Sequence, residues 1–204
     1  DLLGADPTGA GWALPSDAGD LPSDTPLHGF TTVGHSEITI SPIEVELYEA
    51  AAESIVRETL TPERRVAFFG CDVAAEGEPC VRALVARLGR MAWRRPLTTD
   101  EVDPLADLAM RTAALVSDAW EGAGYALSAI LQSPDFLFRV EVGEPDPTDA
   151  SRLRYSSVEM ASRLSFLVWG GPPDDALLRA GERGDLVTEA GITREVLRMQ
   201  SDPR

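Results

Sequence analysis

The sequence predicts an all-α protein, a bundle of about six to seven helices preceded by a long irregular N-terminal arm. Three observations support this fold class. Capping boxes of the form Ser/Thr-x-x-Glu begin at Ser41, Thr98 and Ser156. Apolar residues recur at helical spacing after each of them. The sequence contains neither a series of alternating strand patterns nor an internal repeat.

The first 40 residues predict the irregular arm, because closely spaced glycines and prolines interrupt any helical period. One short strand is compatible with the segment from Phe30 to Ile40. His28 and His35 also lie in this arm, seven residues apart. They are candidates for metal ligation or general-base catalysis, but the same spacing suits two ordinary surface histidines.

The first helix is expected to begin after Ser41, where Pro42 occupies the first helical position and Glu44 completes the capping box. It should extend to about Thr59. Apolar residues every four positions predict one buried face, made by Ile43, Leu47, Ala51 and Ile55.

A second helix is predicted to begin at Pro79 or Cys80 and to end before Pro96. A third helix follows the Thr98 capping box. The fourth, from about Trp120 to Gln132, is apolar almost all round, Tyr125 included, and is therefore the expected centre of the bundle. Two glycines near its start, Gly122 and Gly124, indicate either close packing or fraying.

The later part of the chain begins with an apolar piece, 136–141, that periodicity assigns neither to a helix nor to a strand. The polar segment 144–152 is interpreted as a linker. A helix should run from the Ser156 cap through Trp169, and two shorter helices are predicted near 174–182 and 188–200.

The polar segment 144–152 is also the best candidate for a domain boundary. The sequence has neither an initiator methionine nor a natural C-terminal tail, so we expect the chain to be a piece of a longer protein.

The two cysteines, Cys71 and Cys80, are separated by eight residues, and no histidine follows either one closely. Neither a haem-attachment motif nor a zinc quartet can be built from them. A disulfide is the main interpretation, and two unpaired buried thiols are the alternative. A disulfide would place the protein in an oxidising, extracytoplasmic compartment.

Composition excludes some functions. The chain has 204 residues and a net charge of −16, which argues against nucleic-acid binding because phosphates require clustered basic residues. No apolar run approaches the roughly 20 residues of a membrane-spanning helix. All 18 basic residues are arginine, which either reflects GC-rich codons or favours bidentate pairing with some of the 34 acids.

No catalytic, metal-binding or cofactor-binding residue can be assigned from motifs. The common hydrolase, zinc-protease and phosphate-loop signatures are absent. Adjacent acids such as Asp174 and Asp175 are typical of helix N-termini, where they meet the positive end of the helix dipole.

Four arginines lie beside or within strongly apolar segments and are structural candidates: Arg94, Arg95, Arg139 and Arg163. A buried guanidinium must be paired, so each predicts a carboxylate partner, with Glu141 and Glu159 nearest in sequence. The alternative is an anion-binding site.

Three strings of residues resemble a known family. They run from Cys80 to Thr98, from Ala129 to Arg139, and from Met160 to Trp169 with Asp174 and Asp175 following. The chain thereby resembles planctomycete and myxobacterial cytochrome-c-associated multidomain proteins, built from consecutive domains of unknown function. The opening Asp1-Leu2-Leu3-Gly4 resembles the end of the preceding domain of that family. The resemblance implies three consecutive domains of unknown function: the C-terminal part of a first domain (1–62), a middle helical domain (63–143) and the N-terminal part of a third helical domain (144–204). The flanking domains of the same protein would then be its immediate partners.

The resemblance implies an exported protein, whether periplasmic, secreted or on the cell surface, in which a separate domain can carry c-type haem. This chain has no haem motif of its own. We expect a helical structural or interaction module with a protein or glycan partner. The alternative is an extracytoplasmic enzyme acting on polysaccharide or another polymer, using His28, His35 or unpaired acids.

Overall fold

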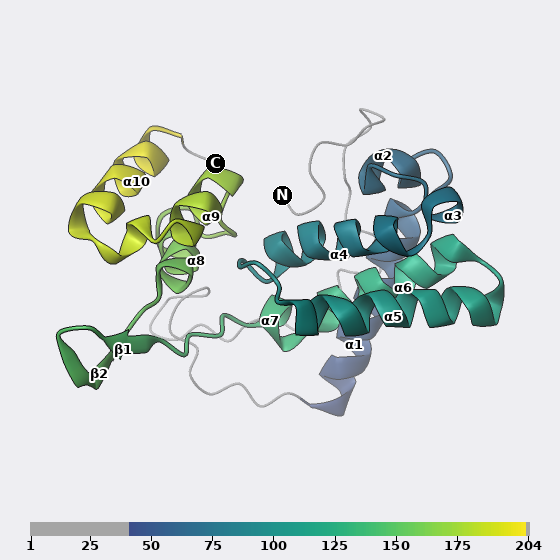
Figure 1. Cartoon of the computed structure of the whole chain (residues 1–204), viewed down its shortest axis with the longest axis horizontal. Coiled ribbons are helices and arrows are strands. Elements are labelled where there is room, and N and C mark those ends of the chain that lie inside the picture. The colour runs from purple at the N-terminus through teal and green to yellow at the C-terminus, as the bar shows by residue number, and fades with distance from the viewer. Residues whose placement is uncertain (1–40, 203–204) are drawn as a thin grey trace. The chain divides into compact units, whose positions relative to one another are not determined.

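The structure is a computed structural model that describes residues 41–202. Over this range it contains ten α-helices, seven of them with seven or more residues, and one small two-stranded sheet (Figure 1). The predicted all-α class is confirmed. The expected strand between Phe30 and Ile40, together with His28 and His35, lies outside the described residues.

The chain divides into two compact units, with described residues 41–93 and 97–137 in the first and 94–96 and 138–202 in the second. Seven helices form the first unit: α1 (Pro42–Thr59), α2 (Arg65–Phe69), α3 (Val73–Glu76), α4 (Glu78–Ala92), α5 (Thr99–Val116), α6 (Ala119–Gln132) and α7 (Pro134–Leu137).

The helix starts follow the predicted capping chemistry. The Ser41 hydroxyl accepts from the backbone N–H of Glu44, whose carboxylate accepts from the Ser41 N–H at 2.6 Å. The same reciprocal box is made at the start of α5 by Thr98 and Glu101. Each box satisfies two backbone donors that a helix leaves open at its N-terminus.

Helix α6 is the centre of the first unit, as predicted. It packs against α1, α3, α4 and α5, and its Ala123, Ala126 and Ile130 are completely buried. Gly122 lies so close to the Ala109 carbonyl of α5 that a Cβ would collide with it. A Cβ on Gly124 would lie 3.1 Å from Val56 of α1. Both glycines therefore serve close packing.

Two predicted core positions differ from the structure. Ile43 in the first turn of α1 is 68% exposed, since burial on this helix begins further along, at Ala51. Tyr125 of α6 is 50% exposed, because the side of α6 that carries it is left open to solvent. Periodicity predicts that a helix is amphipathic but not how far its neighbours cover it.

The second unit contains the hairpin β1 (Glu144–Asp146) and β2 (Asp149–Arg154), then α8 (Ser157–Val168), α9 (Asp175–Glu182), the 3-10 turn η2 (Asp185–Val187) and α10 (Glu189–Ser201). Its core forms where α8, α9, η2 and α10 meet, around Ala161, Leu177, Ala180, Leu186 and Met199.

The antiparallel hairpin replaces the predicted linker at 144–152. Glu144 pairs with Arg154 and Pro145 with Leu153 across the two strands. The carboxylates of Asp146 and Asp149 fix the turn and the second strand by accepting from Thr148 and Ser151. Nearly every residue of β2 is exposed, so the sequence carries no alternation by which a strand could have been predicted.

Candidate functional site

A pocket of about 400 Å³ opens in the first unit between α1, the start of α2 and α6. We call it the α1–α6 pocket. Its volume falls in the range of roughly 300 to 1,000 Å³ that is typical of small-molecule sites. It is lined by Glu53, Val56, Arg57, Leu60, Arg65, Asp118, Trp120, Glu121, Gly124, Tyr125 and Ser128.

Local structure at the start of α6 sets the position of one wall. The Asp118 carboxylate accepts from the backbone N–H groups of Trp120 at 2.8 Å and Glu121 at 3.2 Å, and so fixes the first turn. Gly124, one turn further along, allows α1 to approach closely. The wall that α6 contributes to the pocket therefore has little freedom to rearrange.

Aromatic packing holds Trp120 in this wall. The Arg65 guanidinium carbon lies 4.7 Å from the centroid of the Trp120 ring, and Phe69 meets the same ring edge to face with centroids 5.1 Å apart. Such contacts contribute roughly 0.5 to 1.5 kcal/mol each beyond area burial. Trp120 is thus a structural part of the wall and is only 7% exposed.

A disulfide between Cys71 and Cys80 links the residue two positions after α2 to α4. Beside it, the Arg87 guanidinium of α4 donates to the carbonyl oxygens of Phe68 and Phe69. Burial lowers the pKa of Arg87. Together these contacts fasten the segment that carries Arg65 to the body of the first unit.

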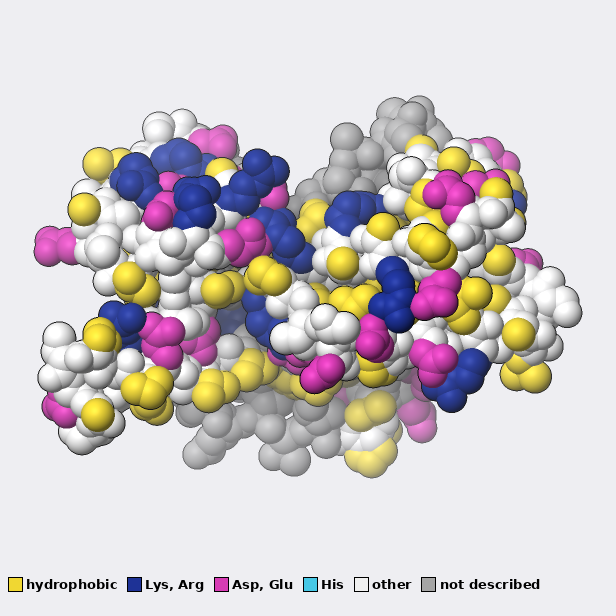
Figure 2. Space-filling model, in the orientation of Figure 1, with side chains coloured by type: hydrophobic (Ala, Val, Ile, Leu, Met, Phe, Trp, Pro, Cys, Tyr) yellow, Lys and Arg dark blue, Asp and Glu magenta, His cyan; other side chains and the backbone are white. Residues whose placement is uncertain are grey.

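Charged side chains of the pocket are not neutralised by one another. Within the described part of the chain, Arg57, Arg65, Glu53 and Glu121 make no ion pair. Elsewhere, ion pairs are made by Arg82, Arg111, Arg154, Arg163, Arg179, Arg183, Arg194 and Arg198. Figure 2 shows such mixed charges over α4 and α5 and over α9 and α10.

Two further side chains complete the chemistry of the pocket. Tyr125 presents a half-exposed ring with its hydroxyl. The Ser128 hydroxyl accepts from the Gln132 side chain at 2.8 Å. The lining of the pocket therefore combines guanidinium donors, carboxylate acceptors and an aromatic surface.

The four arginines singled out from the sequence are all engaged in the second unit, outside this pocket. Arg94 is buried and donates to the Phe138 carbonyl at 2.6 Å, and Arg95 donates to the Pro96 carbonyl. Arg163 pairs with Glu141 at 2.7 Å and stacks on Tyr155. Arg139 lies over the Phe166 ring, which takes the place of the carboxylate expected beside it.

Glu159, the other acid expected to pair with these arginines, binds backbone instead. Its carboxylate accepts from the N–H groups of Val142, Gly143 and Ser156 at 2.7 to 2.8 Å. Burial opposes its ionisation, but the hydrogen bonds from Gly143, Ser156 and Val142 together outweigh burial and lower the pKa of Glu159. This carboxylate ties the segment before the hairpin to the start of α8.

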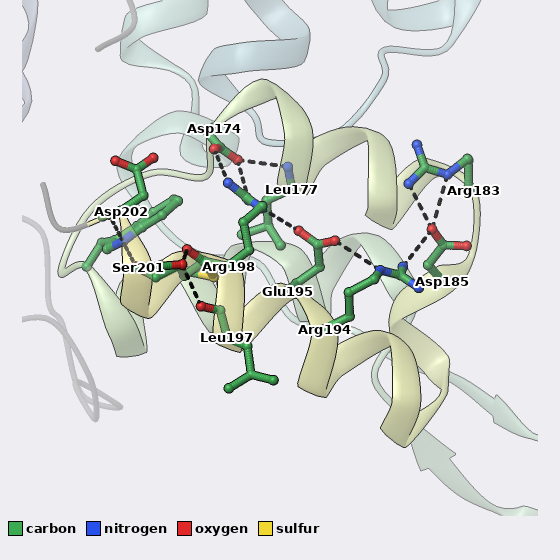
Figure 3. A network of polar contacts seen from close by, with 12 residues as sticks. Asp174, Leu177, Arg183, Asp185, Arg194, Glu195, Leu197, Arg198, Ser201 and Asp202 are labelled. Atoms are coloured by element: carbon green, nitrogen blue, oxygen red, sulfur yellow. Dashed lines mark hydrogen bonds and ion pairs between the residues drawn. The ribbon is translucent and has the colours of Figure 1, made fainter.

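A polar network braces the second unit (Figure 3). Glu195 of α10 is 7% exposed and pairs with Arg198 at 2.8 Å and with Arg194 at 3.4 Å. Arg198 also reaches Asp174, and this hydrogen bond raises the pKa of Arg198. Asp174 caps α9 through the Leu177 N–H, in line with the sequence interpretation of Asp174 and Asp175 as helix-start acids.

The buried Glu195 is therefore fully paired. The network has a structural role, because it connects α9, η2 and α10. Among residues 41–202, no group of three or more His, Cys, Asp or Glu side chains is arranged to hold a metal ion. No helix in the same range is long and apolar enough to cross a membrane.

Sequence reasoning did not find the α1–α6 pocket. It singled out only an apolar face on the first helix, and it placed Tyr125 in a buried helix. The available signal was Gly124 beside Tyr125, since a glycine within an apolar helix indicates a close approach of another element.

Three family models match successive parts of the chain. Residues 1–61 match PSD3, described as a protein of unknown function (DUF1587). Residues 80–141 match PSD5, a protein of unknown function (DUF1595), and residues 155–204 match PSD4, a protein of unknown function (DUF1592). No curated protein and no solved structure matches the chain.

The first unit contains parts of two of the matched segments. Helix α1 falls within the PSD3 match and α6 within the PSD5 match, yet both line the α1–α6 pocket. The pocket therefore requires the two segments together. The chain is a multidomain one that carries, in succession, segments of the PSD3, PSD5 and PSD4 families of unknown function.

Proposed function

We propose that the chain is a helical interaction module of an exported multidomain protein, and that it binds its partner through the α1–α6 pocket. The observation that carries this proposal is the set of charged groups in the pocket without ion pairs in the described chain, Glu53, Arg57, Arg65 and Glu121. Because these groups make no ion pair in the described chain, their hydrogen-bonding capacity stays open for a ligand.

An extracytoplasmic location is part of the proposal. Disulfides persist in oxidising compartments and are rare in the cytosol of most organisms. Cys71 and Cys80 are bonded, and their Cα atoms are 5.9 Å apart, within the usual range for a disulfide. The resemblance to cytochrome-c-associated proteins further suggests a c-type haem domain as a neighbour in the same protein.

This chain would itself bind no haem. Expression with the c-type cytochrome maturation machinery should yield protein without Soret absorbance. Covalently attached haem in these residues would contradict the module proposal.

Partner binding is tested with the exported fraction of the native cells. The chain is immobilised as wild type, as the double variant Arg57→Gln/Glu121→Gln, and as Arg111→Gln, a matched control on α5. We expect a component that wild type and Arg111→Gln retain and the double variant releases. Equal retention by all three variants would show that the pocket is not the binding surface.

A second candidate function is an enzyme acting on a polysaccharide or another polymer. The observation favouring it is that Glu53 of α1 and Glu121 of α6 line the same pocket, and polymer-cleaving enzymes of this kind use two carboxyl groups as general acid and base. Release of new reducing ends by wild type, lost in both Glu53→Gln and Glu121→Gln, would support this function.

A further inference from the structure

We propose that the α1–α6 pocket binds a neutral sugar unit of a glycan. This inference rests on the proposed function, because it names the ligand class of the same pocket. It follows from the presence of charges of both signs, from the one aromatic ring of the lining that is half exposed, and from the contacts that hold the walls in place.

Charges of both signs line the pocket, so an ion of either sign meets repulsion as well as attraction there. Arg57 and Arg65 would repel a cation, and the carboxylates of Glu53, Asp118 and Glu121 would repel an anion. A neutral ligand that both donates and accepts hydrogen bonds meets no such repulsion and can use groups of both kinds. Vicinal hydroxyls fit this requirement, because each hydroxyl offers one donor and two acceptor positions.

Guanidinium and carboxylate groups also match vicinal hydroxyls in geometry. Each presents two neighbouring polar atoms in a plane, so each can engage two adjacent hydroxyls at once. Arg57 lies in the last turn of α1, where its charge also meets the helix dipole. The helix dipole favours an arginine at this position, and the hydrogen-bond donors of its guanidinium remain available to a ligand.

Tyr125 supplies the surface for the apolar face of a sugar ring. The other aromatic side chain of the pocket, Trp120, already lies between Arg65 and Phe69. Tyr125 is half exposed and lines the pocket, and its ring is apolar while its hydroxyl is polar. An amphipathic ring of this kind complements a sugar, which has apolar C–H faces and polar edges.

The walls are held in place before any ligand arrives. Asp118 fixes the start of α6, Gly124 brings α1 close, and the Cys71–Cys80 bridge restrains the segment that carries Arg65. A preorganised site loses little conformational entropy on binding. This matters for neutral sugars, whose hydroxyls must exchange hydrogen bonds with water for hydrogen bonds with protein.

The test uses the full oxidised chain and an array of oligosaccharides in neutral, uronic-acid and amino-sugar forms. The best neutral oligosaccharide is then titrated calorimetrically. Tyr125→Ala, Arg57→Gln and Glu121→Gln should each weaken binding by roughly tenfold or more, and Arg111→Gln should leave it unchanged. Circular dichroism of each variant confirms that the fold is kept.

Three results would overturn the inference: no binding of any neutral oligosaccharide, preference for a charged one, or binding that the three pocket variants leave intact. Failure here is distinguishable from failure of the proposed function. If the pocket variants fail to retain a native partner and that partner is a protein without sugar, the proposal of an interaction module holds and the assignment of a sugar ligand is wrong.

Discussion

The α1–α6 pocket of the first unit and the polar network of the second unit use arginine in different ways. In the network, Arg198 joins Asp174 and Glu195. In the pocket, Arg57 and Arg65 make no ion pair in the described chain, although Arg65 stacks on Trp120. Arginine therefore holds acids together in the network, whereas in the pocket its hydrogen-bond donors remain available for a ligand.

The pocket and the network lie in units that are stabilised differently. The first unit has a large apolar core centred on α6 and a disulfide. The second has a smaller core, and polar bridges connect α9, η2 and α10 around it. A unit with a sufficient core can leave polar side chains unpaired for function.

The largest loss of stability is expected from a cavity in the apolar core of the first unit. Leu127 is 1% exposed at the centre of α6, so Leu127→Ala should lower the free energy of unfolding by about 3 to 5 kcal/mol. Denaturant titration measures this loss. Leu115→Ala is the matched control, because Leu115 is 85% exposed and its truncation should cost less than about 0.5 kcal/mol.

Loss of the disulfide should destabilise the first unit next most strongly. Closing a loop of this length is worth about 2.5 to 3 kcal/mol in the loop-entropy model, so the variant Cys71→Ala/Cys80→Ala should lose about that much. Hydrogen exchange should show faster opening of α2 and α3, with α8 to α10 unchanged. Equally faster exchange in α8 to α10 would contradict the placing of the disulfide's effect in the first unit alone.

Breaking the polar network should affect the second unit. Arg198→Gln leaves the buried Glu195 with one guanidinium, and should lower the free energy of unfolding by about 1 to 2 kcal/mol. The side chain of Arg198 is 31% exposed, which screens the interaction and keeps this loss moderate. An unchanged free energy of unfolding would mean that the network does not stabilise the second unit.

The smallest effect is a dependence on pH. The pKa of Glu159 is lower in the folded chain than its ordinary value of 4.5, so its stabilisation is present above about pH 4.5. It is lost as the pH falls through the folded pKa. Glu159→Gln should cost about 1 kcal/mol at pH 7 and less at lower pH. The exposed Glu189→Gln serves as the control for removing a surface carboxylate from the same unit.

Much of the fold could be predicted because it is encoded locally. The capping boxes at Ser41, Thr98 and Ser156 marked the starts of α1, α5 and α8, and the buried face of α4 followed helical spacing. These signals lie within a few residues of each other. The helical starts therefore needed no knowledge of tertiary contacts.

The hairpin and the pocket could not be predicted, because neither is encoded locally. The hairpin is held by polar turn contacts at Asp146 and Asp149 and buries no alternating face. The pocket depends on Glu53 and Tyr125 meeting across two helices that are far apart in sequence. Which residues of an amphipathic helix stay open is decided by the neighbouring elements.

The most direct test of the central claim is the free energy of unfolding of Arg57→Gln, measured beside that of Arg198→Gln. If the pocket charges serve binding, Arg57→Gln should change stability by about 0.5 kcal/mol or less, the size of a helix-dipole contribution. A loss of about 1.5 kcal/mol or more, equal to that of Arg198→Gln, would contradict the account, because it would make Arg57 a structural brace.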